Sequence, residues 1–188
     1  MSSTDESFEA MTVPHEWYVV SQHLFESSMC LYSNRRTSGT WITKKDASGT
    51  ALAQEHSFDR SFFLLGGFAL ENIIKAFLVY EDPQLLANGK LNFAGRSHQL
   101  NSLADQSRML PWPKKRRTTL KVFEDGLTSW ARYPSGRQFS GAISVLTPTP
   151  ELCSAYQSTY ARFASEIERL LKLNWLGPHG FEGSYEFS

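Results

Sequence analysis

The residues of this chain most suited to chemistry are a few polar side chains set on a strongly apolar background. Glu71 and Lys75 are four positions apart in the most apolar stretch, so in a helix they share one face. His98 opens a later helical segment, and Arg132 closes another. If the four line one cleft, they can bind an anion, and the imidazole can move a proton. They can equally form a closed network that only satisfies buried charges, so both interpretations stay open.

A second candidate is a basic run that follows an aromatic residue. Positive charge beside an exposed ring can hold phosphate and stack a base. Cations at the start of a helix are unfavourable beside the positive end of the helix dipole, and a bound polyanion would compensate both. A solvated loop and helix start is the alternative interpretation. The predicted nucleic-acid-binding residues are Arg108, Trp112, Lys114, Lys115, Arg116 and Arg117.

Common catalytic motifs are absent from the sequence. It has no glycine-rich phosphate loop ending in Lys-Ser/Thr, no His-Glu-x-x-His, no Cys-x-x-Cys and no Gly-x-Ser-x-Gly. The five histidines and two cysteines have no metal-ligand spacing, so neither a metal nor a cofactor is predicted. Cys30 and Cys153 fall within apolar-periodic segments, and we expect two buried, reduced thiols. A metal site or a long-range disulfide is the alternative.

Length and composition favour one globular domain over residues 1–188, with flexible tails at 1–12 and 179–188. The formal net charge is zero, so any binding of nucleic acid must come from a local patch. The polar N-terminus does not resemble a signal peptide. The apolar stretch at 62–80 contains Glu71, Asn72 and Lys75, which are costly in lipid. We therefore expect a cytoplasmic protein without a membrane partner.

These residues must be positioned by helices, because the apolar residues recur with helical spacing. The pattern predicts an all-α bundle of four to five helices with two long loops, at 35–56 and 133–148. A shorter loop is expected at 81–96. The expected helices cover residues 14–34, 58–80, 98–109 and 118–130. A last helix is expected to start at Pro150, to carry apolar positions as far as Leu171 and to be terminated by Gly177-Pro178.

Particular residues indicate where these helices begin and which faces they bury. Thr12, Ser57, Ser97 and Thr149 are candidate N-caps. The adjacent glycines Gly66 and Gly67 lower helix propensity, so we expect another helix to approach closely there. The first helix should bury a face made of four residues: Trp17, Val20, Leu24 and Leu31.

Three pieces of the sequence together resemble the helical HEPN family (higher eukaryotes and prokaryotes nucleotide-binding domain). The first is the apolar segment from Phe63 to Leu78, which carries the Glu and Lys four apart. The second is the His-x-Leu-x-x-Leu helix start within Gly95–Leu103. The third is the Arg-Tyr-Pro helix end within Trp130–Pro134. The resemblance covers roughly residues 57–134, under half of the chain.

This resemblance implies an all-α bundle, commonly dimeric, linked to RNA cleavage, nucleotide binding or defence modules. The Arg-x(4–6)-His pattern of HEPN ribonucleases is absent here, since Arg96 and His98 are only two apart. The leading hypothesis is a non-catalytic or atypical module that binds RNA, a nucleotide or a partner protein, in a defence or toxin–antitoxin context. One alternative is a metal-independent endoribonuclease that uses His98 with Arg96 or Arg132, with Glu71 and Lys75 in the same polar cluster.

A structural dimerisation module is the other alternative. The segment 58–80 is apolar on more sides than one small bundle needs, and the resembled family is commonly dimeric. We therefore expect a homodimer.

Overall fold

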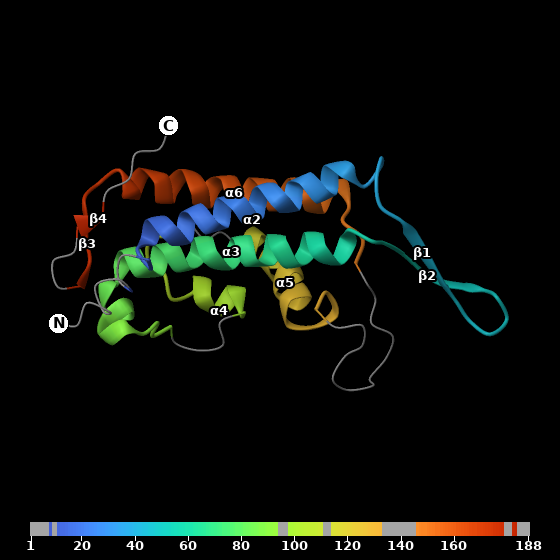
Figure 1. Ribbon diagram of the computed structural model, residues 1–188, viewed down its shortest axis with the longest axis horizontal. Coiled ribbons are helices and arrows are strands. Elements are labelled where there is room, and N and C mark those ends of the chain that lie inside the picture. Colours follow the sequence, from blue (N-terminus) through green and yellow to red (C-terminus); the bar gives the residue numbers. More distant parts are fainter. Residues whose placement is uncertain are drawn as a thin grey trace.

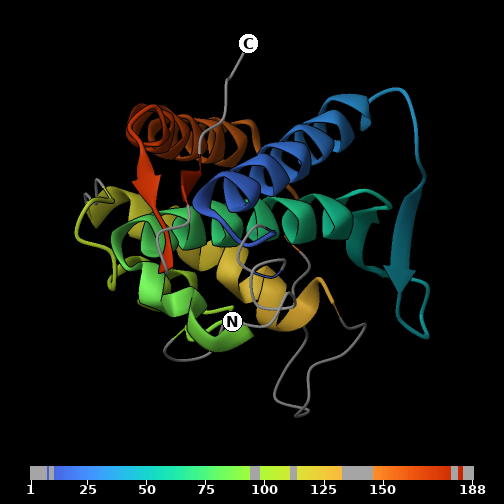
Figure 2. The same ribbon diagram turned by 60° about the vertical axis from the view of Figure 1, so that its left-hand side comes forward.

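A computed structural model of the chain shows a mostly helical bundle around one central helix, α3 (Asp59–Glu81). In both views α3 lies between α2 (Pro14–Asn34) and α6 (Pro150–Leu171) on one side and α4 (Leu100–Ala104) and α5 (Lys114–Asp125) on the other (Figures 1 and 2). The residues that the structure describes are 8, 11–93, 98–110, 114–132, 146–178 and 182–183.

The central helix forms because its 23 residues contain no proline and are apolar on most sides. Fifteen of them are buried by the rest of this chain, and the apolar Leu64, Leu65 and Phe68 are only partly buried. The homodimer itself stays a prediction. α3 is also long and apolar enough to cross a membrane, but 78% of its most apolar window is buried in the bundle.

The two adjacent glycines of α3 lie at a close helix contact, as predicted. A Cβ on Gly66 would lie 2.5 Å from the Cε1 atom of Phe123 and 3.2 Å from the ring of Tyr156. A Cβ on Gly67 would lie 2.6 Å from the Cγ atom of Leu127. Only glycine leaves room for these side chains, so the lost helix propensity is offset by packing of α5 and α6 against α3.

The first expected loop contains a β-hairpin instead, so the fold is not purely α-helical. β1 (Trp41–Lys45) pairs antiparallel with β2 (Ala51–His56), with a register shift at Lys44/Lys45. Asp46 fixes the turn: its carboxylate accepts the backbone N–H groups of Ser48 and Thr50. The Ser48 hydroxyl also donates to this carboxylate, and that bond, followed by those from the backbone, lowers the pKa of Asp46. The hairpin projects beyond the end of the helical bundle (Figure 1).

The remaining elements differ from expectation mainly at their ends. α4 has five residues, and a 3-10 helix (Pro83–Gly89) precedes it in the expected loop at 81–96. α5 begins four residues before the expected Thr118 and continues as a π-helix, η2 (Gly126–Trp130). β3 (Trp175–Leu176) pairs antiparallel with β4 (Glu182–Gly183). Two residues of the expected C-terminal tail therefore form a short strand.

Capping was predicted correctly for only one helix. The Thr149 side chain accepts the backbone N–H of Leu152 and caps α6. At α3 the N-cap is Phe58, and the Ser57 hydroxyl accepts the N–H of Thr40. At α2 the N-cap is Val13, because the Thr12 hydroxyl donates to a carbonyl upstream.

The buried face of α2 is more polar than its sequence suggested. Val20 is 43% exposed and does not belong to it. Buried Ser21 and Ser28 hydrogen-bond the phenols of Tyr160 and Tyr156 on α6, each at 3.0 Å. Burial raises the pKa of both tyrosines. The spacing of apolar residues could not predict this face, because α2 contacts α6 there through pairs of hydroxyl groups.

The two cysteines are both free thiols, but only one is buried. Cys153 lies in the core on α6, whereas Cys30 on α2 is exposed. The expected burial of both thiols is therefore wrong for Cys30, which sits on the outer side of the helix. Within the residues that the structure describes, no group of His, Cys, Asp and Glu could hold a metal ion.

Candidate functional site

Three of the four predicted polar residues meet at the C-terminal half of α3. Lys75 Nζ lies 2.6 Å from Glu71 Oε1, one helical turn away. His98, just before α4, places Nδ1 2.9 Å from Glu71 Oε2. Glu71 is only 3% exposed, so its two oxygens are taken up by these partners. Since a carboxylate accepts, His98 Nδ1 carries the proton and donates it.

The ammonium of Lys75 is also covered by aromatic rings. Its Nζ atom lies 5.0 Å from the ring centroid of Trp17 and 5.2 Å from that of Phe93. The two rings meet edge to face, with centroids 5.7 Å apart. Such cation–π contacts stabilise a cation that is cut off from water. The charges of Glu71 and Lys75 are therefore balanced by each other, by His98 and by the two aromatic rings.

Arg132 does not join this cluster. It follows η2, whose Trp130 carbonyl oxygen accepts a hydrogen bond from Arg60 in the first turn of α3. Arg60 and Glu71 are eleven residues apart along α3, or about 16 Å at 1.5 Å per residue. Arg132 is thus near the opposite end of the helix from His98. Arg96 lies outside the described residues.

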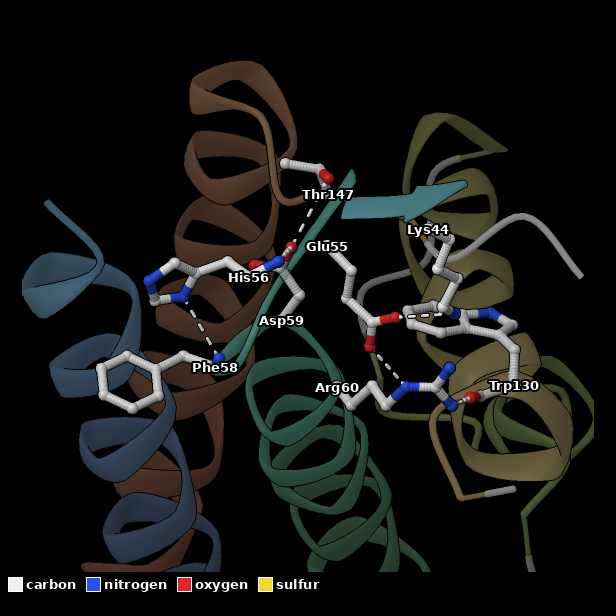
Figure 3. Close-up of polar contacts among 8 residues, drawn as sticks. All are labelled: Lys44, Glu55, His56, Phe58, Asp59, Arg60, Trp130 and Thr147. Atoms are coloured by element: carbon white, nitrogen blue, oxygen red, sulfur yellow. Dashed lines mark hydrogen bonds and ion pairs between the residues drawn. The ribbon is translucent and has the colours of Figure 1, made fainter. Parts of the chain in front are cut away.

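Sequence reasoning missed a second polar cluster, at the base of the hairpin. Glu55 joins Arg60 at 2.6 Å and Lys44 at 3.2 Å. Asp59, fully buried, pairs with Arg35 at 2.8 Å and accepts the N–H of His56. Figure 3 shows Glu55 with Lys44 and Arg60 on one side of the point where the hairpin enters α3, and Asp59 with His56 on the other. The signal in the sequence was acidic residues directly before an apolar helix.

His56, in this second cluster, is held in one neutral form. The backbone N–H of Phe58 donates to its Nδ1 atom at 3.2 Å (Figure 3). Its Nε2 atom must then carry the proton, and it lies 3.1 Å from the carbonyl oxygen of Ser38. The ring is 1% exposed. With both nitrogens engaged by backbone, His56 fixes the hairpin rather than transferring protons.

The basic run leads to an open groove between α5 and α6. The groove has a volume of about 970 Å³. One wall carries Arg116, and Glu151 stands on the facing helix. Its hydroxyl groups come from Thr118, Thr119, Ser154, Ser158 and Thr159, and its apolar surface comes from Val122, Leu152 and Ala155. The sequence predicted only the basic residues on α5. The residues of α6 that line the groove could not be predicted, because the sequence does not show that α6 packs beside α5.

Positive charge is concentrated at this groove. Arg116 is half-buried, and burial lowers its pKa. The nearby charge of Arg162, on α6, lowers it further. The first turn of α5 holds four basic residues and no acidic one. Repulsion between cations and the dipole of α5 both favour an anion at this end of the groove.

The other residues of the predicted basic surface are placed differently. Arg117 pairs with Asp105, its Nη1 atom 3.1 Å from a carboxylate oxygen. Arg108 is exposed, and its backbone N–H donates to Glu81. Lys114 and Lys115 belong to the first turn of α5, but their side chains, like all of Trp112, lie outside the described part of the chain.

Compared with protein-family models, curated proteins and solved structures, the chain matches none of them. The geometry therefore carries the functional argument alone. It offers one closed polar cluster, one cluster that anchors the hairpin and one open cationic groove.

Proposed function

We propose that this protein is a non-catalytic helical module that binds RNA through its phosphates in the groove between α5 and α6. The observation that carries the proposal is Arg116 in the lining of a hollow rich in hydroxyls, where the positive charge of Arg162 on α6 also acts on it. Guanidinium groups bind phosphate in a fixed fork geometry, and hydroxyl groups donate to phosphate oxygens.

The rest of the groove suits a nucleotide chain. Val122, Leu152 and Ala155 offer an apolar surface against which a base or ribose can pack. Its volume is within the usual range for ligand sites. Glu151 adds one negative charge to the lining and directs phosphate toward the Arg116 end. The proposal agrees with the resemblance to the HEPN family, and a defence or toxin–antitoxin context remains part of it.

An endoribonuclease is the second candidate, and one observation favours it. Glu71 holds His98 by Nδ1, which leaves Nε2 as the atom that could take a proton, as in other carboxylate–histidine pairs. Arg132 is too distant to stabilise phosphate charge beside it. Arg96, the other arginine of this hypothesis, lies outside the described residues, so among the described residues binding is the better supported function.

The test measures the affinity of a short fluorescent single-stranded RNA for paired variants. Arg116→Ala/Arg162→Ala removes the arginine that lines the groove and the α6 arginine whose charge acts on it. Arg117→Ala/Arg169→Ala removes two arginines already paired with Asp105 and Glu166. We expect the first double variant to lose at least about tenfold in affinity and the second to stay close to wild type. Equal losses would contradict a groove site.

The same RNA tests the second candidate. Incubation with wild type and with His98→Ala, followed by gel analysis, should give intact RNA in both samples. Cleavage by wild type that His98→Ala abolishes would replace the binding proposal with the nuclease.

A further inference from the structure

One hydroxyl group in the lining of the α5–α6 groove is nearly buried and has no partner. Thr119 on α5 is only 7% exposed, yet within the described part of the chain its hydroxyl makes no hydrogen bond. The Thr159 hydroxyl, which also lines the groove, donates to the carbonyl oxygen of Ala155 at 2.7 Å. A hydroxyl that is largely withdrawn from water and left unpaired costs free energy. Thr119 therefore indicates a ligand that can form a hydrogen bond at this point of the groove.

The two helices that form the groove run in opposite directions along it. Arg116, in the first turn of α5, feels the charge of Arg162, in the second half of α6. Further along α5, Phe123 packs beside Tyr156 of α6, with ring centroids 4.6 Å apart. Residue numbers thus rise along one wall while they fall along the other, so positions on the two walls can be matched.

The α5 wall presents a cation, a hydroxyl and an apolar side chain in that order. They are Arg116, Thr119 and Val122, and all three line the groove. Residues three apart lie on the same helix face, and at 1.5 Å per residue the three positions span about 9 Å along α5. A nucleotide presents phosphate, ribose and base in the same order, and one nucleotide can span such a length.

The α6 wall repeats this order from the same end. Arg162 supplies positive charge there, and Ser158, one turn away, adds a hydroxyl to the lining. Ala155 and Leu152 follow with apolar surface. When a phosphate is bound at the cationic end, the ribose next to it lies at the level of Thr119, and the base reaches the apolar part of the groove.

We propose that the Thr119 hydroxyl hydrogen-bonds the 2′-hydroxyl of a bound ribose and makes the groove selective for RNA over DNA. This inference rests on the proposed RNA-binding function and names the sugar that the same groove recognises. A 2′-hydroxyl both donates and accepts, as the threonine hydroxyl does, so the two groups can pair in either direction. Deoxyribose leaves the Thr119 hydroxyl unpaired, and one net hydrogen bond corresponds to about two- to tenfold in affinity.

The main test compares an RNA and a DNA single strand made only of adenine and cytosine, which differ solely in the sugar. Wild type should bind the RNA about two- to tenfold more tightly than the DNA. Thr119→Val keeps a β-branched side chain without the hydroxyl, and it should bind both strands with the affinity that wild type has for DNA. Thr159→Val is the matched control. Its hydroxyl is already taken up by Ala155, so this variant should keep the preference for RNA.

Two further measurements separate a hydrogen bond from packing. Thr119→Ser retains the hydroxyl and should keep the preference for RNA. An RNA strand with 2′-fluoro groups keeps the sugar conformation of RNA but has no 2′-hydroxyl, and wild type should bind it as it binds DNA. Circular dichroism checks that each variant is folded. If Thr119→Val is not folded, Thr119→Ala is the variant measured.

The outcomes distinguish the ribose contact from the groove itself. Equal binding of RNA and DNA by wild type, or a preference for RNA that survives in Thr119→Val, overturns the ribose contact. A loss of affinity for both strands in Arg116→Ala/Arg162→Ala would still support the phosphate site. If that double variant binds both strands as wild type does, the RNA-binding function fails, and the ribose contact fails with it.

Discussion

The Glu71–Lys75–His98 cluster and the α5–α6 groove both gather charged side chains, but they arrange them in opposite ways. In the cluster, the Lys75 ammonium contacts Glu71 and an aromatic ring, and His98 donates to the other oxygen of Glu71. In the groove, Arg116 has Arg162 as a like-charged neighbour beside an open volume. Charge that is compensated inside a fold stabilises that fold, whereas like charges gathered at a hollow favour a ligand of opposite charge.

The largest effect should come from breaking the cluster. Glu71→Leu leaves Lys75 buried without its carboxylate, and we expect a loss of about 3–5 kcal/mol in the free energy of unfolding. Glu166→Leu, which removes an exposed ion pair with Arg169, should lose no more than about 1 kcal/mol. Urea denaturation measures both. Equal, small losses would mean that the cluster is not structural.

A smaller effect should come from the contact under the groove. Gly66→Ala puts a methyl group against Phe123 on α5 and Tyr156 on α6. We expect about 1–3 kcal/mol of destabilisation from overpacking. The control is Gly126→Ala, whose new Cβ would meet nothing closer than 3.3 Å. Thermal unfolding followed by circular dichroism should show a lower midpoint for Gly66→Ala, and similar midpoints for both variants would refute the close contact.

Local signals predicted the helices well where each signal was self-contained. Thr149 with Pro150 marks the start of α6, and the proline-free apolar run up to Tyr80 marks α3. The hairpin was missed because its alternation is weak: Lys44 and Lys45 interrupt β1, and Ala51 and Ala53 add little apolar character to β2. The sheet is stabilised by Glu55 and Asp59 at its base, which are contacts that no local pattern reveals.

The candidate sites were predictable only in part for the same reason. Glu71 and Lys75 share a helix face by spacing alone, and His98 was correctly placed beside them. Arg132 was misplaced because the path of the chain from α5 through η2 cannot be read from periodicity. The groove needs α5 packed beside α6, so its hydroxyl-bearing half, including Ser154 and Ser158, could not be found from sequence.

The two thiols give a smaller test of how firmly α6 is packed behind the groove. Cys153 lies on α6 between two groove residues but faces the core, and burial raises its pKa. Cys30 is exposed. At mildly alkaline pH a thiol reagent should modify Cys30 quickly and Cys153 only on unfolding. Reaction of both at one rate in folded protein would show that α6 separates from the core.

The salt dependence of RNA binding tests the central claim most directly. For a single strand, the logarithm of affinity falls with the logarithm of salt concentration, with a slope of about 0.7 for each phosphate neutralised. If Arg116 and Arg162 each hold a phosphate, the double variant should have a slope flatter than wild type by about 1.4. Arg117→Ala/Arg169→Ala should run parallel to wild type. Parallel lines for all three proteins would contradict phosphate binding in the α5–α6 groove.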